Sequence, residues 1–326
     1  MRSSRRSCFW RPMRRRSSRA KSCASMAAGL PITCSIHLKR HSEMDALRPI
    51  STLSMLAFGL DHPEGVAWGP DGKIYAGGEL GQLYRIDLES GTFETVATNA
   101  GGFSLGIAHD SSANSYICDQ NLRQIIRVTP DGRSGVYSAG LPDRPITLPN
   151  YPVFDAAGNL YYSDSGEWGK RNGCIWRVAP GGETTIWDTQ ANGFTNGMCL
   201  APDGRALIVV ESTPPLISRV PILDDGSAGT REIIVELPRT VPDGVAFDVD
   251  GALYISLYNP NIIYRYKDGR LETLYDDWEQ YILVAPTNIA FGGADMKTLL
   301  IANLCGWHLA TAPMDVAGLP VQYPTL

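Results

Sequence analysis

The stretch LPRTVPDGVAFDVDG, residues 237–251, decides the fold because the chain repeats it. In this stretch an acid, Asp243, precedes a short apolar strand that runs into an Asp/Gly turn. Five other segments follow the same pattern: HPEGVAWGPDG (62–72), FSLGIAHDSSAN (103–114), LPNYPVFDAAGN (148–159), FTNGMCLAPDG (194–204) and PTNIAFGGADMK (286–297). Self-similarity at a regular spacing is typical of repeat architectures.

Each copy opens a unit of about 45 residues. Aligned on their apolar cores, the copies begin at positions 65, 106, 151, 197, 244 and 288. Further strand-like segments follow each core, for example KIYAGG (73–78), QLYRID (82–87) and FETVAT (93–98). Six units of four short strands predict an all-β fold, a six-bladed β-propeller with a central channel. The sixth unit lacks a fourth strand, and we expect residues 52–58 to supply it and close the ring.

Residues 1–43 differ in composition from the rest of the chain. They carry eleven basic residues and one acid, and they show no clean strand pattern. We expect a basic, disordered tail, followed by one propeller domain over residues 44–326. The tail has the composition of a mitochondrial transit peptide. We favour instead a translation start assigned too early, with Met44 as the first residue; a secretory signal, for which the apolar core is short, is a further alternative.

The charge and the cysteines of the body exclude several classes of protein. Without the tail the net charge is about −15, so no basic surface for nucleic acid is expected. No apolar run approaches the roughly 20 residues of a membrane span. The four cysteines of the body lie singly in strand-like runs, without zinc-finger spacing, which favours buried thiols in a reducing compartment. We expect a cytoplasmic protein, or a mitochondrial one if the tail is genuine.

One position of the repeat carries the chemistry. In a propeller the first strand of each blade lines the channel, so residues at one register converge on one axis. The position before each apolar core reads Glu64, Leu105, Asn150, Asn196, Asp243 and Thr287. Asn and Asp are also common in turns, where they cap backbone groups. Four strong oxygen donors at one symmetry-related position favour a shared ligand instead.

A hard divalent cation fits this set of side chains. Unpaired carboxylates converging in a narrow channel would cost several kcal/mol. Ca²⁺ accepts six to eight oxygens and tolerates carboxylate, amide and water ligands together. The sequence therefore predicts a Ca²⁺ site formed by Glu64, Asn150, Asn196 and Asp243. Mg²⁺ or Mn²⁺ are alternatives, whereas Zn²⁺ fits poorly without His or Cys. A cation with open positions also polarises a carbonyl or phosphoryl oxygen. Asp243 is then the candidate catalytic base.

The motifs that carry these residues resemble those of the senescence marker protein/gluconolactonase family. The resemblance rests on HPEGVAW (62–68), LPN (148–150), FTNG (194–197), VPDGVAFDVDG (241–251) and PTNIAFGGADMKTLLIAN (286–303). It implies a six-bladed propeller with an axial Ca²⁺ and hydrolysis of lactone esters. It also implies the same four metal ligands, with Asp243 as base or nucleophile. Sugar-lactone members carry an Arg where this chain has Leu148, so the resemblance does not carry over a preference for an aldonolactone, and a less polar lactone or ester is the alternative.

Three residues are candidate substrate contacts. His308 follows Trp307 in the last repeat, Trp168 lies in an insertion of the third repeat, and Asn150 is also a predicted metal ligand. His62, two residues before Glu64, is a candidate for orienting that ligand. The chain has no Gly-x-Ser-x-Gly motif, which disfavours a serine hydrolase.

The function predicted from the sequence is metal-dependent hydrolysis of a lactone or related ester. The alternatives are a phosphotriesterase-like hydrolase on the same metal site and a propeller without catalytic activity that binds a partner. The expected partner is a small-molecule lactone or ester, with no nucleic acid and no membrane. We expect a monomer or a small homo-oligomer.

Overall fold

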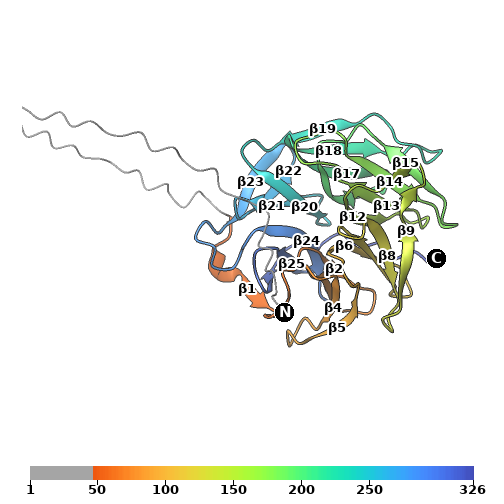
Figure 1. The fold of residues 1–326 in the computed structure, drawn as a ribbon. Coiled ribbons are helices and arrows are strands. Elements are labelled where there is room, and N and C mark those ends of the chain that lie inside the picture. The colour runs from red at the N-terminus through yellow and green to blue at the C-terminus, as the bar shows by residue number, and fades with distance from the viewer. Residues whose placement is uncertain (1–46) are drawn as a thin grey trace, which may run out of the picture. The chain divides into compact units, whose positions relative to one another are not determined.

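The computed structural model describes residues 47–326, and over these residues the chain folds into six four-stranded antiparallel sheets arranged as the blades of a β-propeller (Figure 1). The prediction of an all-β, six-bladed propeller is confirmed. The interpretation of residues 1–43 as a tail lies outside the described residues and stays a prediction. Within residues 47–326 no helix is long and apolar enough to cross a membrane.

The four strands of each blade run outward from the channel. The innermost strands are β2 (Val66–Trp68), β6 (Ser104–His109), β12 (Pro149–Phe154), β16 (Thr195–Leu200), β20 (Val241–Phe247) and β24 (Pro286–Gly292). The second strands are β3 (Ile74–Gly77), β7 (Ser115–Asp119), β13 (Leu160–Asp164), β17 (Ala206–Ser212), β21 (Leu253–Asn259) and β25 (Thr298–Asn303). The third strands are β4 (Gln82–Ile86), β8 (Gln124–Val128), β14 (Cys174–Val178), β18 (Pro215–Pro221), β22 (Ile262–Lys267) and β26 (Leu309–Pro313). The outer strands are β5 (Phe93–Thr98), β9 (Ser134–Ser138), β15 (Thr184–Asp188), β19 (Glu232–Glu236), β23 (Arg270–Asp276) and β1 (Ser54–Leu56). A short hairpin, β10 (Gly140–Leu141) with β11 (Arg144–Pro145), and a 3-10 turn, Ile50–Thr52, complete the described elements.

The ring is closed by the N-terminal strand β1, as the sequence predicts. β1 pairs antiparallel with β26, so the last blade is built from both ends of the domain (Figure 1). The residues around β1 also join the core. Leu53 packs with the cluster between the fifth and sixth blades, and Ala57 packs with the cluster between the sixth and first.

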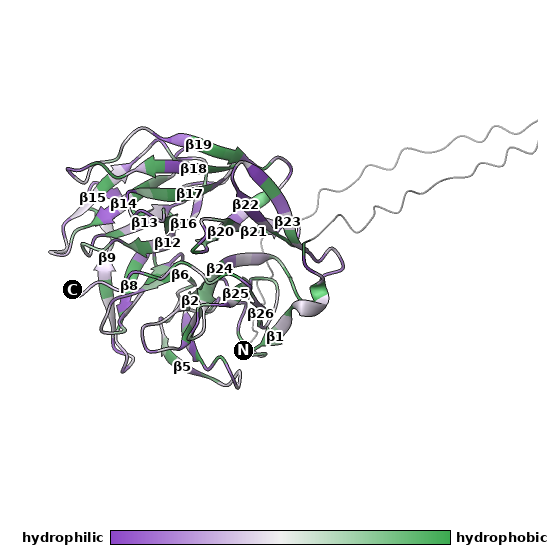
Figure 2. Ribbon diagram, turned by 180° about the vertical axis from the view of Figure 1, so that it is seen from behind, coloured by the Kyte–Doolittle hydropathy of each residue, from purple (hydrophilic) through white to green (hydrophobic). Residues whose placement is uncertain are grey.

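The hydrophobic core is divided among the interfaces between blades. Within the described residues six apolar clusters occur, and each joins two adjacent blades. The second strands are buried on both faces; Ala206–Ser212, for example, is buried at every position. Figure 2 shows the contrast with outer strands such as β19 and β23, where polar and apolar residues mix. Each blade therefore depends on its neighbours for burial of its faces.

Candidate functional site in the central channel

The four predicted ligand residues lie at the starts of the inner strands and are buried. Asn150, Asn196 and Asp243 are the second or third residues of β12, β16 and β20. Glu64 precedes β2. Each of the four is at most 5% exposed. The inner strands contact one another in a closed ring, β2–β6–β12–β16–β20–β24. Residues at the same register of these strands therefore surround one axis.

Register shifts interrupt the pairing between inner and second strands at the position of the predicted ligands. The pairing of β12 with β13 shifts between Pro149 and Pro152, and the shift spans Asn150. Comparable shifts span the same position in the inner strands β6, β16, β20 and β24. Bulges of this kind re-aim side chains and are common beside functional sites. In five blades, the position before the apolar core is thereby excluded from regular pairing.

The glycine after the ligand position lets neighbouring inner strands approach closely. A Cβ on Gly197 would overlap the carbonyl oxygen of Asp243 in the next blade. A Cβ on Gly65 would likewise overlap the carbonyl oxygen of Leu105. The recurring Gly of the repeat is therefore required by the close backbone packing that narrows the channel.

Each of the four predicted ligands holds an oxygen atom without a hydrogen-bond partner. Among the described residues, Glu64 Oε2, Asn150 Oδ1, Asn196 Oδ1 and Asp243 Oδ1 are all buried and unpaired. A buried polar atom without a partner costs about 1–3 kcal/mol, and such atoms are rare in native proteins. Four at one level of one channel indicate a group that the side chains are arranged to receive.

The electrostatics of the two acids agree with this arrangement. Burial, and then the negative charge of Asp243, raise the pKa of Glu64 well above its usual range. Burial raises the pKa of Asp243 to about 7, and a hydrogen bond from Asn196 offsets part of that rise. The carboxyl groups are thus held where their charged forms are poorly solvated.

Acids at the ends of the second strands hold the loops that lead into the channel. The Asp164 carboxylate accepts hydrogen bonds from Thr147 N and Leu148 N, both at 2.8 Å, immediately before Asn150. Asp119 Oδ1 accepts one from Phe103 N at 3.0 Å. In two other blades the Glu211 carboxylate accepts from Gly193 N and the Asn303 amide oxygen accepts from Val284 N in the same way. Asp119 and Asp164 therefore hold the loops that precede the inner strands of their blades.

One residue of the site escaped the sequence reasoning. Asn288 is fully buried, its Nδ2 donates to Glu64 O at 3.1 Å, and its Oδ1 is unpaired among the described residues. It also hydrogen-bonds the Glu64 side chain, which lowers the pKa of that group. The sequence feature that could have identified Asn288 is its position: the sixth repeat has Asn where four other copies have Gly.

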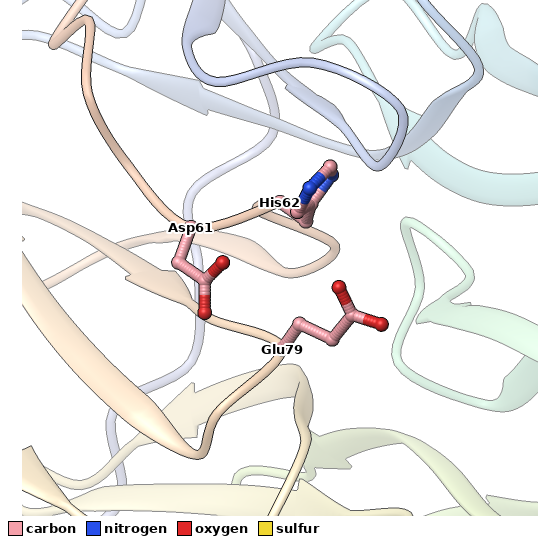
Figure 3. Close-up of side chains that lie close together, drawn as sticks. All are labelled: Asp61, His62 and Glu79. Atoms are coloured by element: carbon pink, nitrogen blue, oxygen red, sulfur yellow. The ribbon is translucent and has the colours of Figure 1, made fainter. Parts of the chain in front are cut away.

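Three titratable side chains meet beside Glu64. Asp61 and His62 precede β2, and Glu79 lies in the β3–β4 loop; their ligand atoms lie within 4.8 Å of one another (Figure 3). His62 Nδ1 lies 3.0 Å from Leu304 O, which can only accept, so Nδ1 donates this hydrogen bond and Nε2 is left for another partner. Asp61 Oδ2 accepts from Leu80 N and Gln82 Nε2.

The candidate substrate contacts differ in their surroundings. Trp168 is 48% exposed and packs edge-on against Phe194, two residues before Asn196, with ring centroids 4.9 Å apart. His308 is 5% exposed, and its Nε2 donates to Ile282 O at 2.9 Å, which uses that nitrogen in the structure. Trp307, the neighbour of His308, is half exposed and packs against His62, with ring centroids 4.3 Å apart. The substrate roles of His308, Trp168 and Asn150 stay predictions.

Two family models match the sequence. The model of the SMP-30/Gluconolactonase/LRE-like region matches residues 79–304, which includes most of the propeller. A strictosidine synthase-like N-terminal model matches residues 41–86.

Curated relatives match over part of their length. A 6-deoxy-6-sulfogluconolactonase from Pseudomonas putida is 34% identical over 114 residues, which are 33% of this chain and 38% of that protein. Lactonase drp35 from Staphylococcus haemolyticus is 29% identical over 116 residues, which are 32% of this chain and 34% of that protein. The matches thus span little more than a third of these relatives.

Solved structures share the fold over most of the chain. A gluconolactonase from Xanthomonas campestris has a TM-score of 0.69 at 20% identity, covering 80% of this chain and 89% of that one. A calcium-binding protein, regucalcin, from Agrobacterium tumefaciens has a TM-score of 0.67 at 18% identity, covering 84% and 98%. At these identities the likeness establishes the propeller fold.

Proposed function

The chain belongs to the SMP-30/gluconolactonase/LRE-like family, and we propose that it hydrolyses lactones with a divalent cation, Ca²⁺ by preference, bound in the central channel. The observation that carries the proposal is the set of four buried, unpaired oxygens on Glu64, Asn150, Asn196 and Asp243. Two carboxylates and two amides are a hard, all-oxygen donor set, which fits Ca²⁺ and, less well, Mg²⁺ or Mn²⁺. Zn²⁺ is disfavoured by the lack of His and Cys among the four.

The four residues would hold the cation, with Asn288 Oδ1 as a further uncommitted oxygen beside Glu64. When bound, the cation would supply Lewis-acid polarisation of the lactone carbonyl. A positive charge also removes the cost of two close buried carboxylates, because it stabilises the charged forms that burial disfavours.

Asp243 is the proposed base for attack by water. Its carboxylate lies at the ligand position, where it would face a water molecule beside the bound cation and accept a proton from it. Water adds to the carbonyl carbon and passes a proton to the Asp243 carboxylate. The ring C–O bond then breaks, and the proton goes to the leaving alkoxide oxygen, giving the hydroxy acid. His62, whose Nδ1 is held by Leu304 O and whose Nε2 is left for another partner, is the alternative base at this end of the channel.

The mouth of the channel favours a substrate with an apolar substituent. The loops between second and third strands open at the end of the channel that holds the four oxygens, because the second strands run antiparallel to the inner ones. These loops expose Leu80 (67%), Trp168 (48%) and Trp307 (50%). Leu148 stands at the position where sugar-lactone members of the family carry an Arg that binds substrate hydroxyl groups. We therefore propose an alkyl-substituted lactone in preference to a polyhydroxylated one.

The test is an assay of the purified chain against a panel, with Ca²⁺ or with EDTA. The panel contains undecanoic δ-lactone, glucono-δ-lactone, an aryl acetate and paraoxon. We expect Ca²⁺-dependent opening of the alkyl lactone at a higher kcat/KM than glucono-δ-lactone. Binding of Ca²⁺, measured by calorimetry, without turnover of any lactone would overturn the hydrolase and favour a binding module.

Paired variants separate the two candidate bases. Asp243→Asn keeps an oxygen for the cation and removes the base, so we expect kcat to fall by about 10²-fold or more, with Ca²⁺ affinity reduced far less. His62→Gln serves as the matched variant and should keep most activity. Full activity in Asp243→Asn, with loss in His62→Gln, would transfer the base to His62.

A further inference from the structure

Asn288 lies in the sixth blade, between the blades that carry Asp243 and Glu64. It follows Thr287, the residue of β24 that stands at the ligand position of the repeat. Both side chains reach the same atom: Thr287 Oγ1 donates to Glu64 O at 2.7 Å, and Asn288 Nδ2 donates to it at 3.1 Å. Consecutive side chains of a regular strand point to opposite faces, so the shared acceptor requires an irregular strand here.

A bulge at the start of β24 turns both side chains toward the first blade. Between Pro286 and Ile289 β24 takes three steps where its partner β25 takes two. Thr287 and Asn288 therefore share the place of one residue in the ladder, and a bulge of this kind re-aims side chains. The second residue of the corresponding bulge is Gly in the second, fourth and fifth blades. Asn288 thus supplies a polar side chain where those blades have none.

The hydrogen bonds of Asn288 fix which end of its amide is left over. Glu64 O can only accept, so the amide nitrogen of Asn288 faces it. The same amide hydrogen-bonds the Glu64 carboxyl group. Asn288 Oδ1, on the other arm of the amide, is buried without a partner among residues 47–326, and the residue is 0% exposed. Buried polar atoms in native proteins are nearly always paired, so this oxygen is left for a bound group.

The same arrangement occurs beside the other acid of the ligand ring. Asn196 hydrogen-bonds the Asp243 carboxyl group, and its Oδ1 is also buried and unpaired within the described part of the chain. Each acid thus has one amide beside it that donates a hydrogen bond and keeps its oxygen uncommitted. Asn196 is a predicted cation ligand, and Asn288 shares its burial, its hydrogen bond to an acid and its unpaired oxygen.

The opposite end of the channel differs in character. A cavity of about 450 Å³ there is lined mainly by apolar later residues of the inner strands, such as Ile107, Ala246 and Ala290. Neither Asn288 nor any of the four predicted ligands lines it. The unpaired oxygen of Asn288 therefore belongs to the same end of the channel as the ligand ring.

We propose that Asn288 Oδ1 is a fifth ligand of the cation held by the four predicted ligands, an inference that rests on the proposed function. Ligands then come from every blade except the second, which places Leu105 at the ligand position. Ca²⁺ takes six to eight oxygens, so five protein oxygens leave about one to three positions for water and substrate. Mg²⁺ usually keeps several waters, so this set of ligands favours Ca²⁺ over Mg²⁺.

The test counts the water molecules on a bound Tb³⁺ ion, which replaces Ca²⁺ at oxygen sites and whose luminescence lifetimes in H₂O and D₂O report coordinated water. Water fills the place of a lost protein ligand, so Asn288→Ala should raise the count by about one. Asn288→Gly should do the same, and it introduces the residue that four other repeats carry at this position. Both variants should bind Ca²⁺ about tenfold more weakly or worse, measured by calorimetry.

Two further variants separate ligation from support of Glu64. Thr287→Val is the matched control, because it removes a hydrogen bond to the same atom, Glu64 O, from a hydroxyl that is already paired. It should leave the water count unchanged. Asn288→Asp keeps an oxygen for the cation and loses the donor to Glu64, so it should restore the water count of the unaltered chain.

The outcomes distinguish this inference from the proposed function. An equal water count in the unaltered chain, Asn288→Ala and Asn288→Gly would overturn the inference, and Ca²⁺-dependent lactone opening would then still stand. A higher count in these variants, with no lactone opened by the unaltered chain, would support the fifth ligand and overturn the hydrolysis. Absence of Tb³⁺ binding that depends on Glu64, tested with Glu64→Gln, would overturn both.

Discussion

The carboxyl groups of Glu64 and Asp243 come from the first and the fifth blades and interact inside one channel, where the charge of Asp243 raises the pKa of Glu64. No contact along the chain brings them together. The ring of inner strands does so, because it places the same repeat position of every blade around one axis. The ring geometry is therefore what the first prediction tests.

Gly197→Ala should destabilise the fold and disturb the ligand ring. The added Cβ would overlap the carbonyl oxygen of Asp243, so one of the two inner strands must move. We expect a loss of more than about 2 kcal/mol in unfolding free energy and weaker Ca²⁺ binding. Gly181→Ala is the control, since an added Cβ there meets nothing within 4 Å, and its change should stay within about 0.5 kcal/mol. Equal stability of the two variants in urea unfolding would contradict the close packing.

Asp164→Asn should weaken Ca²⁺ binding although Asp164 is not itself a predicted metal ligand. The carboxylate accepts from Thr147 N and Leu148 N, just before Asn150, and from Trp176 Nε1. An amide offers one acceptor oxygen in place of two, so the loop loses an anchor. We expect Ca²⁺ affinity to fall by about 10-fold to 100-fold, as for other residues that orient metal ligands. Unchanged Ca²⁺ affinity, measured by calorimetry on a folded variant, would show that this loop does not position Asn150.

Leu53→Ala should loosen the closure of the ring. Leu53 is 5% exposed and packs in the cluster between the fifth and sixth blades, next to the latching strand β1. Removal of such a side chain costs about 2–5 kcal/mol. Met55, within β1, is 51% exposed, so Met55→Ala should change stability by no more than about 0.5 kcal/mol. Thermal and urea unfolding of the two variants measure the difference. A Leu53→Ala variant as stable as Met55→Ala would mean that the latch contributes little.

His109 should make the fold less stable as the pH falls. Burial lowers its pKa to about 4, against the nearby negative charges of Asp71 and Asp110, which act to raise it. The unfolded chain, with a histidine pKa near 6.5, then binds more protons between about pH 6.5 and pH 4, so stability is present above this window and is lost within it. The contribution is at most about 3 kcal/mol, since one pKa unit equals about 1.4 kcal/mol.

The matched variant is His109→Gln, which cannot titrate. Between pH 6.5 and pH 4.5 its unfolding free energy should fall less than that of the unaltered chain. A titration of the His109 ring by NMR that gives a pKa near 6.5 would contradict the prediction. So would identical pH dependence of the two proteins.

The sequence by itself determined the repeat, and with it the number of blades, the strand that closes the ring and the four residues that share one register. These follow from periodicity, because every copy must bury the same faces against the next copy. It did not reveal Asn288, since that residue stands at the position after the ligand register and reaches Glu64 O across the closure of the ring. Nor did it reveal the β3–β4 loop that carries Glu79 to His62.

Only the tertiary structure decided which ends of the channel are polar and apolar and what covers them. Asp243 Oδ1 has no hydrogen-bond partner because it is buried in a channel where the inner strands approach closely at Gly197 and Gly65. The C-terminal segment 319–323 lies across the opposite end of the channel. It is held there because Leu319 N donates to Phe247 O of the fifth blade and the Tyr323 hydroxyl donates to Trp68 O of the first. Such contacts join segments with no common pattern, so periodicity carries no record of them.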